Sequence, residues 1–292
     1  MSEALETTHL TKRYGKVSAL RDCNLALPTG RVIGLVGPNG AGKTTLMHLA
    51  VGLLAPTSGA VQVFGHSPQV EPTRVLARVG FVAQDRPLYD SFTAREMLEF
   101  GRQLNGRWDA PYATERISRL RIPLDRPVRN LSTGQRAQIA LTLALGKRPD
   151  FIILDEPVVN LDPLARSEFL QGLMTAVAEN GSTVLMSSHV IADLERVCDY
   201  LVILAAGGVQ LAGDIETLLS HHAFVVGPRR EEAADDPSTI EVVHTERQTL
   251  RLVRTAEPEA PHTLADGTSI RPPTLDELVL AYLRMPQIDE AA

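Results

Sequence analysis

A phosphate-binding pattern lies near the N-terminus of this 292-residue chain. Residues 37–45 read GPNGAGKTT, which is GxxxxGK followed by Thr, between an apolar run and a helical pattern. In such a loop backbone N–H groups surround phosphates, the lysine reaches the β- and γ-phosphates, and the hydroxyl after it faces Mg²⁺. A chance glycine turn is the alternative, and the flanking patterns argue against it. The predicted phosphate site consists of Gly37, Pro38, Asn39, Gly40, Ala41, Gly42, Lys43, Thr44 and Thr45.

An acidic pair follows another apolar run, FIILDEP at 151–157. Four apolar residues predict a buried strand, and open α/β sheets bind ligands at the carboxyl ends of their strands. Asp155 suits Mg²⁺, and Glu156 would face the attacking water as its base or orienting group. Taken alone, such a pair is more often a helix cap or a solvated turn. Beside a phosphate loop, the catalytic interpretation is favoured.

Two more polar residues follow predicted strands. His189 comes after TVLMSS at 183–188 and could hydrogen-bond a γ-phosphate, although a lone histidine in such a place is usually structural. Gln84 ends the strand-like VGFVAQ and could donate to water or contact a metal-bound oxygen. Strand ends that share one sheet edge would bring these groups together. The predicted catalytic residues are Glu156, His189, Gln84 and Lys43, and the predicted Mg²⁺ residues are Thr44, Gln84 and Asp155.

A second anion-seeking segment is LSTGQ at 131–135, which opens directly into an apolar-periodic helix. A helix start of this kind presents unpaired N–H groups and a partial positive charge. It can also be no more than a well-capped helix. Since the chain already has one complete phosphate loop, the segment raises the question of which phosphate it would serve.

Apolar runs alternate with helical patterns along most of the chain. Runs that are apolar throughout predict strands buried on both faces, and hence a mainly parallel α/β sheet covered by helices. The strand-to-helix pairs are VIGLVG at 32–37 with a helix from Lys43, FIILD at 151–155 with a helix from Pro163, and TVLMSS at 183–188 with a helix through Val197.

Two segments depart from this alternation. Between Asp90 and Arg148 only helical patterns occur, which predicts an all-α subdomain over about 88–149. Before the phosphate loop, residues 9–15 and 18–27 alternate between apolar and polar, which predicts a small antiparallel side sheet.

The last part of the chain predicts a small α+β appendage. Residues 239–244 and 248–254 alternate as a hairpin, and a final helix begins with a capping box from Thr274 to Glu277. The polar stretch 227–238 is interpreted as a flexible joint. The predicted domains are a nucleotide-binding domain over 1–220 and an accessory domain over 221–292.

Composition narrows the classes of function. The net charge of −6 gives no electrostatic footprint for duplex nucleic acid, so no nucleic-acid partner is expected. Cys23 and Cys198 fit neither a metal motif nor a disulfide framework, which suits a reducing compartment. No apolar run approaches the roughly 18–20 residues of a membrane span, and the first residues lack a signal-peptide layout. These features predict a cytoplasmic chain.

Taken together, the motifs resemble the nucleotide-binding subunits of ATP-binding cassette (ABC) transporters. The phosphate loop, Gln84, LSTGQ, FIILDEP, the NLD at 160–162 and His189 occur in that family's order and spacing, over residues 1 to about 220. The resemblance implies ATP and Mg²⁺ as cofactors. It also implies head-to-tail pairing of two cassettes, so that Ser132, Gly134 and Gln135 of one chain cap the γ-phosphate held by the other.

The resemblance assigns two further residues and has two departures. Tyr14 matches the aromatic residue on which adenine stacks, and Asp162 matches the loop that links the two half-sites. Thr133 stands where the family usually has glycine, and Val159-Asn160 replaces a small residue and a glycine. Neither change removes a catalytic group, so ATP hydrolysis is still expected.

The resemblance also implies a membrane partner. Residues 88–100 resemble the surface on which the coupling helix of an integral membrane permease docks, and the last helix resembles the tails of bacterial ABC-2 exporter cassettes. The implied protein is a peripheral ATPase on the cytoplasmic membrane face, paired with an identical or a different cassette. It would energise an exporter through ATP-driven dimerisation.

Two other classes were weighed. Non-transport cassette proteins that act on ribosomes usually carry two cassettes in one chain, and those that act on DNA carry a long coiled coil; this sequence has neither pattern. A P-loop kinase or a GTPase would not predict LSTGQ together with His189, and a GTPase also needs an NKxD-like base reader. The ABC ATPase is therefore favoured.

Overall fold

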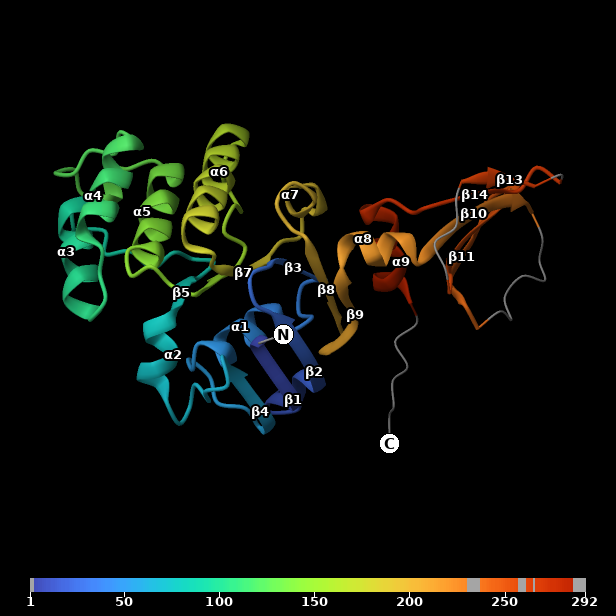
Figure 1. Cartoon of the computed structure of the whole chain (residues 1–292), viewed down its shortest axis with the longest axis horizontal. Helices are drawn as coiled ribbons and strands as arrows, with labels where there is room; N and C mark the ends of the chain where they lie inside the picture. The colour runs from blue at the N-terminus through green and yellow to red at the C-terminus, as the bar shows by residue number, and fades with distance from the viewer. Residues whose placement is uncertain (1–2, 230–236, 257–260, 265, 286–292) are drawn as a thin grey trace.

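The centre of the protein is a six-stranded sheet of order β5-β6-β7-β3-β8-β9. The computed structural model describes residues 3–229, 237–256, 261–264 and 266–285. All pairings are parallel except that of β9 with β8, which confirms the predicted α/β class (Figure 1). The strands are β3 (Val32–Val36), β5 (Val79–Val82), β6 (Phe151–Leu154), β7 (Thr183–Ser187), β8 (Tyr200–Ala205) and β9 (Gly208–Asp214).

Both faces of this sheet are covered because its parallel strands are apolar along most of their length. Successive side chains of a strand point to opposite faces, and in β6 Ile152 and Leu154 join one hydrophobic cluster whereas Phe151 and Ile153 join another. Helices α5 (Thr133–Leu145) and α6 (Pro163–Asn180) pack into the first cluster, and α1 (Lys43–Ala50) packs into the second. Polar residues therefore stand at the ends of its parallel strands, as Ser187 does in β7 and Asp155 does after β6.

A three-stranded antiparallel side sheet packs into the second cluster, as the alternation before the phosphate loop predicted. Its order is β2-β1-β4, with β1 at Glu3–Tyr14, β2 at Val17–Pro28 and β4 at Ser58–Val63. Buried Leu5 and Leu20 of this sheet share the cluster with Leu46 of α1. Helix α2 (Pro72–Arg78) then leads into β5.

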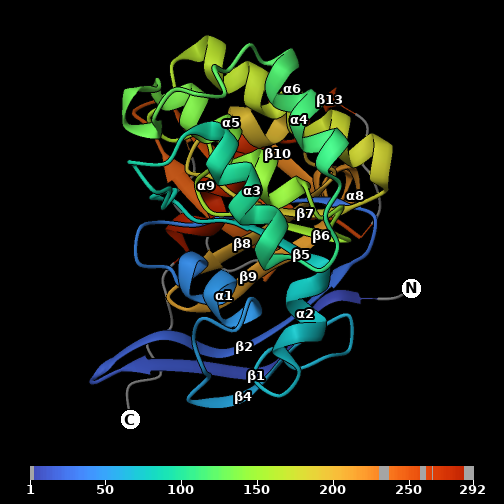
Figure 2. The same ribbon diagram turned by 90° about the vertical axis from the view of Figure 1, so that its left-hand side faces the viewer.

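A helical group occupies the opposite side of the central sheet from the side sheet (Figure 2). It comprises α3 (Ala94–Leu104), α4 (Ala110–Arg119), a short 3₁₀ turn η1 (Val128–Asn130) and α5, as the missing strand patterns predicted. These helices have their own buried cluster, which includes Met97, Ile117 and Ile139. Thr93 and Glu96 form a capping box that fixes where α3 begins.

The strands nearest the C-terminus form a third sheet beyond the central one, here called the C-terminal sheet (Figure 1). Its order is β11-β12-β10-β14-β13, and the predicted hairpin is its β11–β12 pair. Helix α9 begins with the predicted Thr274–Glu277 capping box. The elements are α7 (Ile191–Glu195), α8 (Ile215–Ser220), β10 (His222–Pro228), β11 (Thr239–His244), β12 (Gln248–Arg254), β13 (His262–Thr263), β14 (Ser269–Arg271) and α9 (Leu275–Arg284).

Two local expectations need correction. The polar stretch 227–238, predicted as a flexible joint, lies within one sheet, because β10 before it and β11 after it both pair with β12; residues 230–236 themselves lie outside the described part of the chain. The helix after β7 ends at Glu195, two residues short of Val197. Among the described residues, no helix has the length and apolar character that crossing a membrane requires.

Helix α9 joins the C-terminal sheet to the central core. Its Leu278 and Tyr282 are buried in the same cluster as Leu201 of β8. The Tyr282 hydroxyl accepts a hydrogen bond from Arg254 Nε (2.9 Å) and lies 2.9 Å from His222 Nε2. His222 Nδ1 is 2.6 Å from the Leu218 carbonyl oxygen. A neutral imidazole that donates from Nδ1 and accepts at Nε2 satisfies this whole chain of contacts.

This network predicts acid sensitivity. Burial lowers the pKa of His222, the Leu218 hydrogen bond opposes this effect, and the nearby Arg254 and His221 add to it. The unfolded chain, with a histidine pKa of about 6.5, therefore binds a proton that the folded chain does not. The free energy of unfolding should fall as the pH decreases below about 6.5, with a contribution from His222 of up to about 1.4 kcal/mol per pH unit.

The measurement is urea unfolding of the wild type and His222→Gln at pH 7.5 and 5.5. The substituted protein should lose less stability between the two pH values than the wild type, since glutamine does not titrate. Equal losses in both proteins would show that His222 is not the group responsible.

Candidate active site

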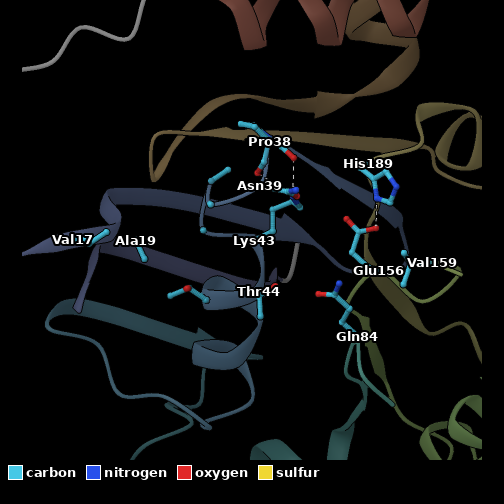
Figure 3. Close-up of a pocket in the computed structure, with 15 residues that line it drawn as sticks. Val17, Ala19, Pro38, Asn39, Lys43, Thr44, Gln84, Glu156, Val159 and His189 are labelled. Carbon is cyan, nitrogen blue, oxygen red and sulfur yellow. Dashed lines mark hydrogen bonds and ion pairs between the residues drawn. The ribbon is translucent and has the colours of Figure 1, made fainter. Parts of the chain in front are cut away.

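A cavity of about 860 Å³ lies at the carboxyl edge of the central sheet. It collects residues from the ends of four strands that are neighbours in the sheet, β5, β6, β7 and β3 (Figure 3). Adjacent parallel strands end at the same edge, which explains why residues distant in sequence meet here. The lining residues are Val17, Ala19, Gly37 to Thr45, Gln84, Glu156, Val159 and His189.

The phosphate loop joins β3 to α1 and needs glycine at two close approaches. A Cβ on Gly37 would lie 2.1 Å from the Leu204 carbonyl oxygen, and one on Gly42, at φ +104°, would lie 2.4 Å from the Ala19 carbonyl oxygen. Only glycine fits at these two places, because any side chain would collide with the neighbouring backbone. All nine residues of the loop, 37–45, line the cavity. In loops of this kind main-chain N–H groups bind phosphates.

Lys43 extends its amine across this loop. Its Nζ donates to the carbonyl oxygens of Gly37 (2.7 Å) and Pro38 (3.2 Å), and the side chain is buried (Figure 3). Burial lowers the pKa of Lys43, while the negative charges of Glu156 and Asp155 raise it. These contacts hold a cation directly beside the N–H groups, where an anionic group bound in the loop would meet it.

Asp155 is buried with one oxygen occupied. Its Oδ1 accepts from Ser187 Oγ (2.7 Å), whereas Oδ2 has no hydrogen-bond partner among the described residues. A buried carboxylate oxygen left unpaired is costly, and oxygen ligands with water are what Mg²⁺ prefers. Asp155 is not among the lining residues, whereas Thr44 and Gln84 are. Together the three side chains offer oxygen donors of the kind that would suit a Mg²⁺ ion and would hold it beside a bound phosphate. The described residues contain no cluster of three or more His, Cys, Asp or Glu able to hold a metal by themselves.

Glu156 and His189 form a pair at the cavity wall (Figure 3). The distance from His189 Nδ1 to Glu156 Oε2 is 2.8 Å. An ionised carboxylate only accepts, so Nδ1 carries the proton in this pair. The Glu156 side chain is 11% exposed and that of His189 57% exposed, so a carboxylate sheltered from water faces the cavity while its histidine partner remains accessible.

Ser187 is a residue that the sequence analysis missed. It ends β7, where its Oγ donates to Asp155 and accepts from the backbone N–H of Glu156 (2.8 Å). One hydroxyl therefore fixes both members of the acidic pair. The sequence feature that could have indicated Ser187 is a polar residue at the end of a mainly apolar strand. Its contact with the acidic pair after β6 depends on the strand order, which the sequence does not give.

The segment 131–135 lies outside this cavity. Ser132 Oγ accepts from the Gln135 N–H (3.2 Å) and Gln135 Oε1 accepts from the Ser132 N–H (3.1 Å), which makes a capping box for α5. A Cβ on Gly134 would be 2.9 Å from Cβ of Ala165. Thr133 is exposed. The structure therefore does not bring Ser132, Gly134 and Gln135 to the phosphate loop of their own chain.

Tyr14 and Asp162 also lie outside the set of lining residues. Tyr14 is 48% exposed at the end of β1 and is paired with Val17, which does line the cavity. Asp162 caps α6 by accepting from the Ala165 N–H (3.0 Å). Asn160 has φ +61°. Asparagine tolerates this left-handed backbone better than other non-glycine residues, which explains how it replaces glycine here.

A phosphate loop and an acidic pair at the same edge of a parallel sheet define a P-loop nucleoside triphosphatase. The family model described as ABC transporter matches residues 20–159. The ABC transporter ATP-binding protein YtrB of Bacillus subtilis (strain 168) is 31% identical over 73% of this chain and 73% of its own length. The chain belongs to the ATP-binding proteins of ABC transporters, and it is an ATPase.

Other relatives agree with this assignment. Nod factor export ATP-binding protein I of Ralstonia nicotianae (strain ATCC BAA-1114 / GMI1000) is 34% identical over 74% of this chain and 69% of its own length. A solved structure described as the dimeric structure of MJ0796, a bacterial ABC transporter cassette, is 25% identical with a TM-score of 0.65. It covers 72% of this chain and 98% of that one.

The double contact of Ser187 gives a prediction. Ser187→Ala removes a charge-assisted hydrogen bond to Asp155, so the free energy of unfolding should fall by about 1.5–3 kcal/mol, and kcat for ATP hydrolysis should fall because Glu156 loses a backbone anchor. Ser182→Ala is the matched control, since Ser182 is buried and donates only to the Pro149 carbonyl oxygen. Its cost should be about 0.5–1.5 kcal/mol, with kcat unchanged. Equal effects of the two substitutions on both stability and kcat would contradict this assignment.

Proposed function

We propose that this chain is the ATP-hydrolysing subunit of a membrane exporter and that it works as one of two cassettes that close around ATP. The observation that carries the proposal is the separation within one chain of the phosphate loop from the capped helix start at 131–135. Each is an anion-seeking feature, and only the first belongs to the cavity of its own chain. Two chains placed head to tail would complete each other's sites. The dimeric cassette among the similar structures supports this arrangement.

In the proposed reaction, the phosphate loop and Lys43 bind the ATP phosphates, and Tyr14 stacks on the adenine at the rim. Glu156 accepts a proton from the attacking water, and the 2.8 Å contact with His189 orients its carboxylate. Bound Mg²⁺, next to Thr44, Gln84 and Asp155, would neutralise phosphate charge. The partner's Ser132, Gly134 and Gln135 would cap the γ-phosphate with N–H and hydroxyl donors, and Asp162 would lie where the two sites meet.

An aromatic cluster supports docking of a permease on the helical group. Tyr89, Phe92 and Phe100 have ring centroids 4.9, 5.3 and 6.1 Å apart, and Tyr89 is 52% exposed. Exposed aromatic side chains are enriched at protein interfaces. Tyr89, the first residue of the cluster, follows the cavity residue Gln84 by five positions, so a helix docked on the cluster would contact the chain close to the cavity. On this proposal the chain lies on the cytoplasmic face of the membrane, and the relative named for Nod factor export favours the outward direction.

Glu156→Gln separates binding from hydrolysis. The amide keeps the shape of the side chain but cannot accept the proton from water, so kcat should fall by about 10²–10⁴-fold while ATP still binds. Size-exclusion chromatography with ATP and Mg²⁺ should show a dimer that the wild type does not accumulate. Hydrolysis at the wild-type rate would refute the assigned role of Glu156.

The same variant identifies the partner. Tagged Glu156→Gln protein is captured from detergent-solubilised native membranes with ATP and Mg²⁺, and the bound proteins are identified by mass spectrometry. A polytopic membrane protein in stoichiometric amount is the expected result. Ribosomal or DNA-associated proteins instead would mean that the ATPase serves a function other than transport.

Ser132→Arg tests the composite site. A bulky cation on the exposed helix start should block closure of the dimer but leave nucleotide binding by the monomer unchanged, because Ser132 does not line its own cavity. Dimer formation is followed by size-exclusion chromatography in the Glu156→Gln background, and binding by titration with a fluorescent ATP analogue. Loss of monomer binding would show that the segment serves its own chain.

A further inference from the structure

Arg86 is a buried cation that has no role in the proposed reaction. It contacts the turn that follows the acidic pair. It follows Gln84 in the turn after β5 and is 8% exposed. Its Nη2 donates to the carbonyl oxygens of Pro157 (3.0 Å) and Val159 (2.8 Å). These carbonyls belong to the turn that directly follows Glu156. A single guanidinium therefore ties the Gln84 turn to the Glu156 turn.

Both turns have strained backbones. Glu156 has φ +45°, Asn160 has φ +61° and Arg86 itself has φ +46°. Non-glycine residues adopt this region only when their surroundings over-determine it, at a cost of about 1–3 kcal/mol each. Around Glu156 the contacts are its N–H with Ser187 Oγ, its carbonyl oxygen with the Val159 N–H (3.2 Å) and its carboxylate with His189. The two carbonyls downstream contact Arg86. Arg86 is thus one of the few contacts that hold this conformation.

An arginine at this place is energetically expensive. Among the described residues no carboxylate contacts it and its Nε has no partner, and burial together with the nearby Arg136 lowers its pKa. Apolar residues usually fill buried space at lower cost than a charge. Packing alone does not explain why an arginine stands at this position. The need of two carbonyl oxygens for hydrogen-bond donors from one direction does explain it.

We infer that Arg86 is a positioning residue for ATP hydrolysis. By holding the 157–159 turn, it keeps Glu156 in its left-handed backbone conformation, with the carboxylate facing the cavity beside Gln84 (Figure 3). It does not line the cavity. This inference rests on the proposed role of Glu156 as the base.

The position of Arg86 also bears on coupling to the membrane partner. The Leu88 N–H donates to the Arg86 carbonyl oxygen (2.7 Å), and Leu88 directly precedes the exposed Tyr89. A displacement of the aromatic cluster on docking would therefore reach the turn of Arg86 and, through the guanidinium, the turn after Glu156.

The test compares Arg86→Ala and Arg86→Lys with Arg119→Ala, an exposed arginine of α4 that pairs with Glu115. Loss of the clamp misplaces a base, so kcat of Arg86→Ala in the full chain should fall at least about tenfold with the KM for ATP unchanged. Lysine supplies donors without the planar fork, so Arg86→Lys should have an intermediate kcat. Arg119→Ala should behave like the wild type.

A double substitution separates positioning from general stability. If Arg86 acts through Glu156, adding Arg86→Ala to Glu156→Gln should not slow the residual hydrolysis further. A further loss of the same factor, or a raised KM with a lowered Tm at unchanged kcat, would overturn the inference. If Arg86→Ala does not fold, Arg86→Lys decides the question: a lowered kcat supports the inference and a wild-type kcat overturns it. Wild-type turnover by Glu156→Gln alone would instead refute the proposed base.

Discussion

The burial of both faces of a parallel sheet is the constraint on which this structure depends. Strands such as β6 send alternate side chains into two separate hydrophobic clusters, so no polar side chain fits along their length. Polar residues can stand only where a strand ends, and parallel strands end together. The order β5-β6-β7-β3 then places Gln84, Glu156, His189 and the phosphate loop along one edge without any further device. The same requirement that stabilises the core therefore assembles the site.

At that edge the charges are sheltered and compensate one another. Lys43 is held by carbonyl oxygens of its own loop. Burial lowers the pKa of Lys43, and the negative charges of Glu156 and Asp155 oppose this effect. Asp155 retains an unpaired oxygen, which is unfavourable in the isolated chain and becomes useful once a cation or its water is present. On the proposed function, the ligand that would suit these charges carries both negative phosphate and a divalent cation. The charges that affect the stability of the folded chain at this edge are therefore the same charges that would bind the ligand.

The sequence could predict features that are local and complete in themselves. The phosphate loop, the strands before Asp155 and His189, the side sheet and the capping box at Thr274 each carry their own signal within a few residues. Features set by tertiary contact could not be predicted. Strand β10 stands beside a polar stretch that obscured it, and Ser187 meets Asp155 only because β7 lies beside β6. The contact of Arg86 joins residues 71 and 73 positions apart, and no pattern in the chain indicates it.

The separation of the two anion-seeking features has a thermodynamic consequence. A chain whose phosphate loop and capping helix met internally would bind ATP in one state and gain nothing from a partner. When the cap comes from a second chain, part of the binding energy of ATP is released only on closure, so the nucleotide favours the closed pair over the open one. That difference sets the upper limit on the work available to a docked membrane protein, since a ligand shifts an equilibrium only by its differential affinity. Hydrolysis removes the γ-phosphate that both chains would contact, and the preference for the closed state is lost with it. On this proposal, Arg86 joins the Gln84 turn to the turn after Glu156, so closure of the pair and the orientation of Glu156 would be linked through its guanidinium.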